Sequence, residues 1–227
     1  MSWNEIIQFA VEKRRWLHRH PELTWEEKNT GVYIREQLGQ LGITWRSCAE
    51  HGAVATLAAQ APGEHVALRT DMDALPIEEN ADIDYRSEAS GKMHACGHDG
   101  HMAALLGVAA YLKRHEHELP GPVSLIFQPA EEGGHGAKQM IHDGALEGVD
   151  CIYGWHNWPA LPAGVALCPD GAVMSGNGTF HMTIRGQGGH ASQPEETRDP
   201  VLAASAITLN LQQIISRRLP PQAAAVV

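Results

Sequence analysis

Three mostly apolar runs near the middle of this 227-residue chain each end in polar side chains that can do chemistry. The runs and the polar residues that follow them are Val66–Arg69 with Asp71 and Asp73, Val123–Phe127 with Glu131 and Glu132, and Cys151–Tyr153 with His156. Helical patterns lie between them, at about residues 100–114 and 137–142. Strands that alternate with helices are typical of a mostly parallel sheet covered by helices. The sequence therefore predicts an α/β fold for residues 1–177.

The polar residues are expected to converge on one site. In open α/β sheets, sites form at the carboxyl ends of the strands, which share one edge of the sheet. A loop with Cys96 and His98 directly precedes the longer predicted helix, so we expect it at the same edge. Thiolate, imidazole and carboxylate groups bind zinc and its neighbours in the transition series. Of the adjacent Glu131 and Glu132, one can hold a metal while the other takes and returns a proton.

Each of these residues also has an interpretation without function. A single buried Cys is most often inert core, paired Glu residues at a strand end are usually solvated, and His156 can be a satisfied core histidine. A second catalytic interpretation makes Cys96 a covalent nucleophile with His98 or His101 as its base, but it leaves the Glu pair and His156 unexplained. The occurrence of all these residues on successive strand ends favours the metal centre.

The C-terminal part of the chain has a different pattern. Residues Thr179–Arg185 alternate apolar and polar side chains, which predicts a half-buried strand. Asp199 followed by Pro200 predicts a helix start, and Ala223–Val227 has the composition of a strand. We therefore predict that a second domain begins at residue 178 and is incomplete at residue 227.

Composition excludes some classes of partner. The formal net charge of −10 argues against a nucleic-acid interface. We expect no membrane span, because no apolar run approaches the roughly 20 residues that a span needs. The N-terminal sequence lacks the order of a signal peptide, so a cytoplasmic location is expected, with the four Cys residues reduced.

Six stretches of the chain together resemble a known family. They are RRWLHRHPEL, ALRTDMDALPIEE, GKMHACGHDGHMAALLG, SLIFQPAEEGGHGAKQMI, GWHNWP and GQGGHASQP, and they span about residues 14–194. They resemble the metal-dependent amidohydrolases related to aminoacylase and carboxypeptidase, in the branch of hippurate hydrolases and plant indole-acetyl-amino-acid hydrolases. The resemblance implies a zinc-exopeptidase-like catalytic domain, here residues 1–177, and a smaller inserted α+β dimerisation domain, begun by residues 178–227.

The resemblance also implies roles for individual residues. These are Cys96 as bridging metal ligand, His98, Glu132 and His156 as further ligands, Glu131 as general base, Asp73 as a supporting acid, and His190 as a group that polarises the scissile carbonyl across a dimer. Asp71 is expected to support the ligands without binding metal. Two divalent ions are implied, with zinc or manganese favoured over cobalt or nickel. The implied substrate is an N-acyl amino acid, and the implied full-length protein is a homodimer.

The family usually completes its metal site with a His from the C-terminal part of the catalytic domain. Its chains approach 400 residues, so the resemblance implies that this ligand lies beyond Val227. An alternative function therefore stays open: the 227-residue chain can be a truncated, catalytically inactive remnant that binds metal or dimerises.

Overall fold

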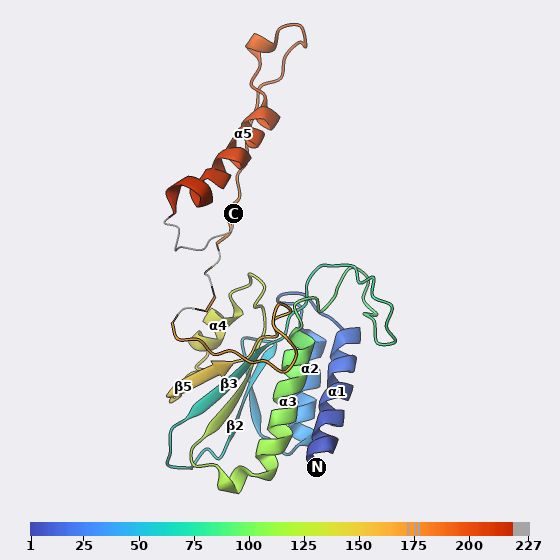
Figure 1. Ribbon diagram of the computed structural model, residues 1–227, viewed down its shortest axis with the longest axis vertical. Coiled ribbons are helices and arrows are strands. Elements are labelled where there is room, and N and C mark those ends of the chain that lie inside the picture. The colour runs from blue at the N-terminus through green and yellow to red at the C-terminus, as the bar shows by residue number, and fades with distance from the viewer. Residues whose placement is uncertain (172, 175, 177, 220–227) are drawn as a thin grey trace. The chain divides into compact units, whose positions relative to one another are not determined.

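The computed structural model describes residues 1–171, 173–174, 176 and 178–219. The chain divides into two compact units, Met1–Pro162 and Ala163–Val227. The first unit holds a five-stranded sheet and four α-helices, and Figure 1 shows them, with the four helices and the strands β2, β3 and β5 labelled. The predicted division at residue 178 into catalytic and dimerisation domains stays a prediction.

The sheet has the strand order β1-β2-β4-β3-β5. Its strands are β1 (Trp45–Cys48), β2 (Gly52–Leu57), β3 (Val66–Asp71), β4 (Val123–Gln128) and β5 (Cys151–Gly154). The strands β4, β3 and β5 pair in parallel, whereas β1 pairs with β2, and β2 with β4, in antiparallel fashion. The parallel strands are the three that carry the polar clusters, so their carboxyl ends do share one edge.

Alternation along the strands creates two apolar layers, because successive side chains point to opposite faces of a sheet. On one face, Ala55, Leu125 and Phe127 join a core with residues of three helices. On the other face, Val54 and Ile126 pack in a second core with the short helix α4. The helices of the first face are α1 (Trp3–Arg19), α2 (Lys28–Gln40) and α3 (His98–Arg114), and α4 is Gly136–His142. Figure 1 shows α1, α2 and α3 side by side against the sheet.

Local sequence explains where most helices begin and end. Helix α1 begins with a capping box, because the Ser2 side chain accepts from the Glu5 backbone and the Glu5 side chain accepts from the Ser2 backbone. Thr24 and Glu27 have the spacing of a second capping box, which predicts a helix start at Thr24, but the structure has none there. Helix α2 begins at Lys28, because the Thr24 hydroxyl donates to Asp73 instead, at 2.8 Å. A 3-10 turn, η1 (Glu116–Glu118), follows α3.

The second unit contains η2 (Pro194–Glu196), α5 (Pro200–Gln213) and the π-helical turn η3 (Ile214–Arg218). Asp199 caps α5 as predicted, because its side chain accepts from the backbones of Val201 and Leu202. The predicted strand Thr179–Arg185 is wrong, since these residues are irregular and exposed or half-buried. Alternation alone does not form a strand without a partner strand. The predicted strand Ala223–Val227 lies outside the described residues.

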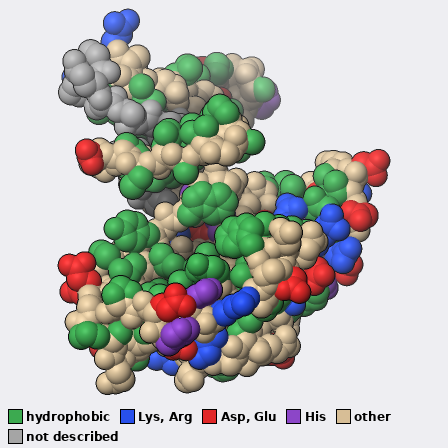
Figure 2. All heavy atoms as spheres, turned by 60° about the horizontal axis from the view of Figure 1, so that its bottom comes forward, with side chains coloured by type: hydrophobic (Ala, Val, Ile, Leu, Met, Phe, Trp, Pro, Cys, Tyr) green, Lys and Arg blue, Asp and Glu red, His purple; other side chains and the backbone are tan. Residues whose placement is uncertain are grey.

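The surface carries apolar side chains among charged ones, as the face drawn in Figure 2 shows. On α1 and α3, the exposed apolar residues include Trp3, Ile7, Val108 and Tyr111. Within the described part of the chain, none of the helices is long and apolar enough to span a membrane.

Candidate metal centre

The metal centre is built from loops that follow β3, β4 and β5 and from the start of α3. The loop of residues 95–97 places Cys96 two residues before His98, the first residue of α3, with Gly97 between them. Gly97 makes this possible, because its φ is 94° and a Cβ there would lie 2.5 Å from Oδ1 of Asn157. The loop after β5 contributes His156. The structure therefore brings residues from four separate segments of the first unit to one edge of the sheet.

His98 is fully buried and has one ring nitrogen without a hydrogen-bond partner. Its Nδ1 lies 2.8 Å from the backbone carbonyl oxygen of Asp73, so Nδ1 carries the proton and donates. Its Nε2 is buried and has no hydrogen-bond partner among the described residues, and Oδ2 of Asp71 lies 3.6 Å from it. A metal-binding histidine has this arrangement, since the second ring nitrogen fixes the tautomer by donating to a carbonyl group. The lone pair of Nε2 is therefore available to a cation.

His156 and Cys96 meet beside His98. The Nδ1 of His156 donates to the backbone carbonyl of Asn157 at 2.7 Å, which leaves the Nε2 lone pair facing Sγ of Cys96 at 3.3 Å. Cys96, His98 and Glu132 each offer one ligand atom, and these atoms lie within 4.8 Å of one another. Sulfur, nitrogen and oxygen ligands at this spacing fit a divalent transition metal.

Glu131 and Glu132 approach the same imidazole. The nearest carboxylate oxygen of each lies 3.9 Å from Nε2 of His98. Asp73 holds their backbone, because its Oδ1 accepts from the N–H of Glu131 at 3.0 Å and its Oδ2 from that of Glu132 at 2.9 Å. The Glu131 side chain is more exposed than the Glu132 side chain, at 41% against 25%. Glu131 thus has better access to a water molecule or substrate.

In the metal-free site, the surroundings of Cys96, His98 and Glu131 favour the protonated form of each group. Burial, together with the charge of Glu132, raises the pKa of the Cys96 thiol to about 12. Burial alone would lower the pKa of His98, but Asp73, Asp71 and Glu132 together raise it. Burial and the neighbouring Glu132 raise the pKa of Glu131. A raised thiol pKa disfavours Cys96 as a metal-free nucleophile, which needs a lowered one, whereas a cation would relieve this accumulation of negative charge.

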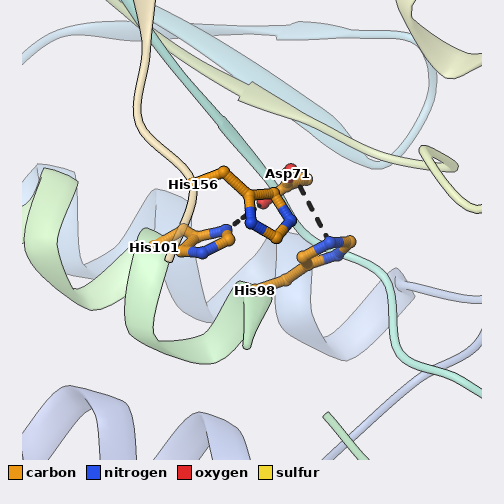
Figure 3. Close-up of side chains that lie close together, drawn as sticks. All are labelled: Asp71, His98, His101 and His156. Carbon is orange, nitrogen blue, oxygen red and sulfur yellow. Dashed lines mark hydrogen bonds and ion pairs between the residues drawn. The ribbon is translucent and has the colours of Figure 1, made fainter. Parts of the chain in front are cut away.

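A second group of possible ligands includes His101, which sequence reasoning did not assign to the metal site. Figure 3 shows Asp71, His98, His101 and His156 together, with ligand atoms within 4.8 Å of one another. The spacing of His98 and His101, three residues apart in a helix, was the available signal, because such residues share a face.

Both ring nitrogens of His101 already have partners. Its Nδ1 lies 2.7 Å from Oδ1 of Asp71, and its Nε2 lies 3.1 Å from the backbone nitrogen of Asn157. Asp71 also binds Arg69 at 2.9 Å. Its pKa is held well below the ordinary value: burial acts to raise it, but His101, His98 and Arg69 outweigh burial. His101 therefore connects the end of β3 with the segment that carries His156.

His190 belongs to the second unit. Its ring is exposed, and its Nδ1 lies 2.7 Å from the hydroxyl of Ser192. Its role at the scissile carbonyl stays a prediction, as do the individual roles of Cys96, His98 and the two Glu residues.

Fold and site together define an α/β protein with a candidate metal centre at the carboxyl edge of its sheet. The chain belongs to peptidase family M20/M25/M40, whose profile matches residues 67–224. This confirms the family that the six sequence stretches indicated and the predicted α/β class.

Similar proteins include enzymes that act on different amides. The chain is 47% identical over 218 residues to IAA-amino acid hydrolase ILR1-like 2 of Arabidopsis thaliana, covering 96% of this chain and 49% of that protein. It is 44% identical over 214 residues to N-acetyl-L-cysteine deacetylase of Bacillus subtilis, covering 94% of this chain and 51% of that protein. The chain thus spans about half the length of the curated relatives it matches.

Two solved structures share the fold. Bacillus subtilis YXEP protein, a dinuclear metal-binding peptidase of the M20 family, is 40% identical with a TM-score of 0.67, covering 70% of this chain and 45% of that one. A proposed aminohydrolase from methicillin-resistant Staphylococcus aureus is 33% identical with a TM-score of 0.79, covering 99% of this chain and 60% of that one.

Proposed function

We propose that the complete protein hydrolyses the amide bond of N-acyl amino acids, releasing a carboxylic acid and an amino acid. The observation that carries the proposal is the buried Nε2 of His98, which has no hydrogen-bond partner among the described residues and faces Glu131 and Glu132 at 3.9 Å each. The names of the relatives support it, because they include an IAA-amino acid hydrolase and an N-acetyl-L-cysteine deacetylase.

Four residues would hold the two divalent ions: Cys96, His98, Glu132 and His156. The dinuclear metal binding stated for the YXEP protein supports the count of two. Zinc or manganese is the favoured metal, and cobalt or nickel would also suit these ligands. When bound, such ions lower the pKa of a water molecule and polarise a carbonyl group.

Glu131 is the proposed general base and acid. Its carboxylate takes a proton from the attacking water, the new C–O bond forms, and Glu131 returns the proton to the nitrogen as the C–N bond breaks. Burial and the neighbouring Glu132 raise the pKa of Glu131, which makes its carboxylate a stronger base for this exchange. Asp73 supports the step by fixing the backbone of Glu131.

The remaining parts of the proposal concern the assembled protein. We propose that the complete protein forms a homodimer, in which His190 polarises the scissile carbonyl and stabilises the developing oxyanion. We also include a cytoplasmic location.

Replacement of Glu131 by Gln tests the central step. We expect Glu131→Gln to abolish turnover of N-acyl amino acids while metal content, measured by elemental analysis, stays near that of the unaltered protein. Glu36→Gln is the matched control, because Glu36 is an exposed carboxylate on α2. If loss of metal accounts for the whole defect, Glu131 is a ligand and the assignment is wrong.

The alternative of an inactive remnant is tested by assaying the 227-residue chain beside a version extended by the downstream coding sequence. Metal binding without turnover in the shorter chain, and turnover in the longer one, would support the remnant for this chain and amide hydrolysis for the extended protein. Turnover by the shorter chain would exclude the remnant.

A further inference from the structure

Four charged side chains form a network beside the metal-binding loop. His18 of α1 lies between two buried carboxylates, with its Nδ1 2.7 Å from Oδ2 of Asp99 and its Nε2 3.0 Å from Oε1 of Glu79. Arg14, one turn earlier in α1, binds the same Oδ2 of Asp99 at 2.8 Å. The side chains of His18, Asp99 and Glu79 are at most 3% exposed. Nothing in the proposed reaction uses this network.

The geometry fixes the protonation of His18. A neutral imidazole has one N–H group and one lone pair, so one of its nitrogens would point a lone pair at a carboxylate oxygen. An imidazolium donates from both nitrogens and satisfies both carboxylates. It also balances the charges, because Arg14 and His18 then face Asp99 and Glu79.

Other neighbours of His18 fit this state. The ring of Tyr85 meets it edge-on, with centroids 5.6 Å apart. Arg14 opposes a positive charge at His18, whereas burial lowers the pKa of nearby His94 to about 4, so that the His94 ring is uncharged near neutral pH. The hydrogen bond with Asp99 nevertheless outweighs burial, and the pKa of His18 is raised above its ordinary value.

The network is connected to the chain on both sides of the loop that carries Cys96. On one flank, Asp99 directly follows His98 in the first turn of α3. On the other, Oε2 of Glu79 accepts from the backbone of Ser87 at 2.7 Å, and the Ser87 hydroxyl donates to the carbonyl of Lys92 at 2.7 Å. The chain then continues through a bridge between Met93 and Leu75 into the loop with Cys96. Within this network, His18 is the side chain that contacts both Asp99 on one side and Glu79 on the other.

We propose that His18, as an imidazolium that donates from both ring nitrogens, is a positioning residue that holds the Cys96–His98 segment in the geometry that binds metal. The inference rests on the metal site of the proposed function and is independent of its substrate. His18 acts through Asp99 and Glu79, and it does not contact the metal ligands itself.

Nuclear magnetic resonance of the full chain, labelled with ¹⁵N in its histidines, tests the protonation directly. We expect both ring nitrogens of His18 to carry protons near neutral pH. Through-bond couplings assign the signals, so no variant is needed. A single protonated nitrogen at His18 would overturn the proposal, because one carboxylate would then hold the proton instead.

Cobalt(II) binding tests the positioning. In His18→Gln the side chain can donate to only one of the two carboxylates, so we expect cobalt affinity to fall by about tenfold or more. The thiolate-to-cobalt absorption band that reports the Cys96 bond should weaken as well. His117→Gln is the matched control, since the His117 side chain is 79% exposed, and it should bind cobalt like the unaltered chain.

Circular dichroism distinguishes positioning from general loss of structure. If His18→Gln does not fold, Glu79→Gln takes its place, because an amide there keeps the side-chain size and removes one carboxylate. Lowered thermal stability with unchanged cobalt affinity and unchanged absorption would overturn the proposal. Failure of the N-acyl amino acid assay with normal cobalt results would count against the proposed function alone.

Discussion

Nδ1 of His98 lies 2.8 Å from the backbone carbonyl oxygen of Asp73, and both side chains are buried. The carboxylate of the same Asp73 accepts from the backbones of Glu131 and Glu132 and from the hydroxyl of Thr24. Asp73 thereby links a proposed ligand on α3 with the proposed base and ligand after β4. Asp73, two residues after the end of β3, therefore helps to fix the distance between His98 and the two Glu residues, which act on the same metal and water in the proposed mechanism.

Replacement of Asp73 by Asn should therefore disturb the metal centre without removing a ligand. Asn keeps one side-chain acceptor, but its amide group would face a backbone N–H of Glu131 or Glu132. Loss of such an orienting partner typically lowers metal affinity by about 10–100-fold, and a competitive titration with a chromogenic chelator measures this. The exposed Asp82 supplies the control Asp82→Asn, and equal affinities for the two variants would contradict the role.

Much of this arrangement could be predicted from the sequence, because strand period and strand-end chemistry are local signals. The polar clusters after β3, β4 and β5 converge as expected from parallel pairing. The start of α2 could not be predicted, since the Thr24 hydroxyl bonds Asp73, which is 49 residues away. The networks of His18 and His101 were missed for the same reason, as their partners are 81 and 30 residues distant.

The local pattern was least informative in the second unit. Alternation at Thr179–Arg185 indicates which side chains could share a face, but it does not supply a strand to pair with. In the described residues of this unit the only ladder contact is an isolated bridge between Gln187 and Arg198. The cap at Asp199 was predictable, because it depends on its own next three residues.

Buried Glu27 should make stability depend on pH. Its Oε1 accepts from the backbone of Ala130 at 2.6 Å, and its Oε2 has no partner among the described residues. Burial raises its pKa from 4.5 to about 7. The folded chain thus binds a proton that the unfolded chain has released, so this contribution to stability is present below about 4.5 and is lost as the pH rises through about 7.

The variant Glu27→Gln should remove this dependence, since an amide does not titrate. We expect its free energy of unfolding relative to the unaltered chain to increase by up to about 3 kcal/mol between about pH 4.5 and 7. Urea denaturation at several pH values measures the difference. Glu36→Gln serves as control for an exposed carboxylate, and a difference that does not vary with pH would show that Glu27 is ionised throughout.

Metal binding should release protons. The pKa of Cys96 is raised to about 12, so the thiol is protonated in the metal-free chain, and the pKa of His98 is raised as well. A cation binds thiolate and neutral imidazole, and we therefore expect at least the thiol proton to leave and metal affinity to rise with pH. Calorimetric titration in buffers of different ionisation enthalpy counts these protons. The variant Cys96→Ser should release about one fewer, and an equal count would mean that the thiol is not a ligand.

His101 should behave as a support of the site and not as a ligand. Its two ring nitrogens are engaged by Asp71 and by the backbone of Asn157, so neither is available in this arrangement. We expect His101→Gln to keep the metal stoichiometry of the unaltered chain while lowering affinity, because the segment with His156 loses its anchor. In contrast, His98→Gln should lower the stoichiometry itself. Elemental analysis after gel filtration compares the two variants, and equal loss of metal in both would make His101 a ligand.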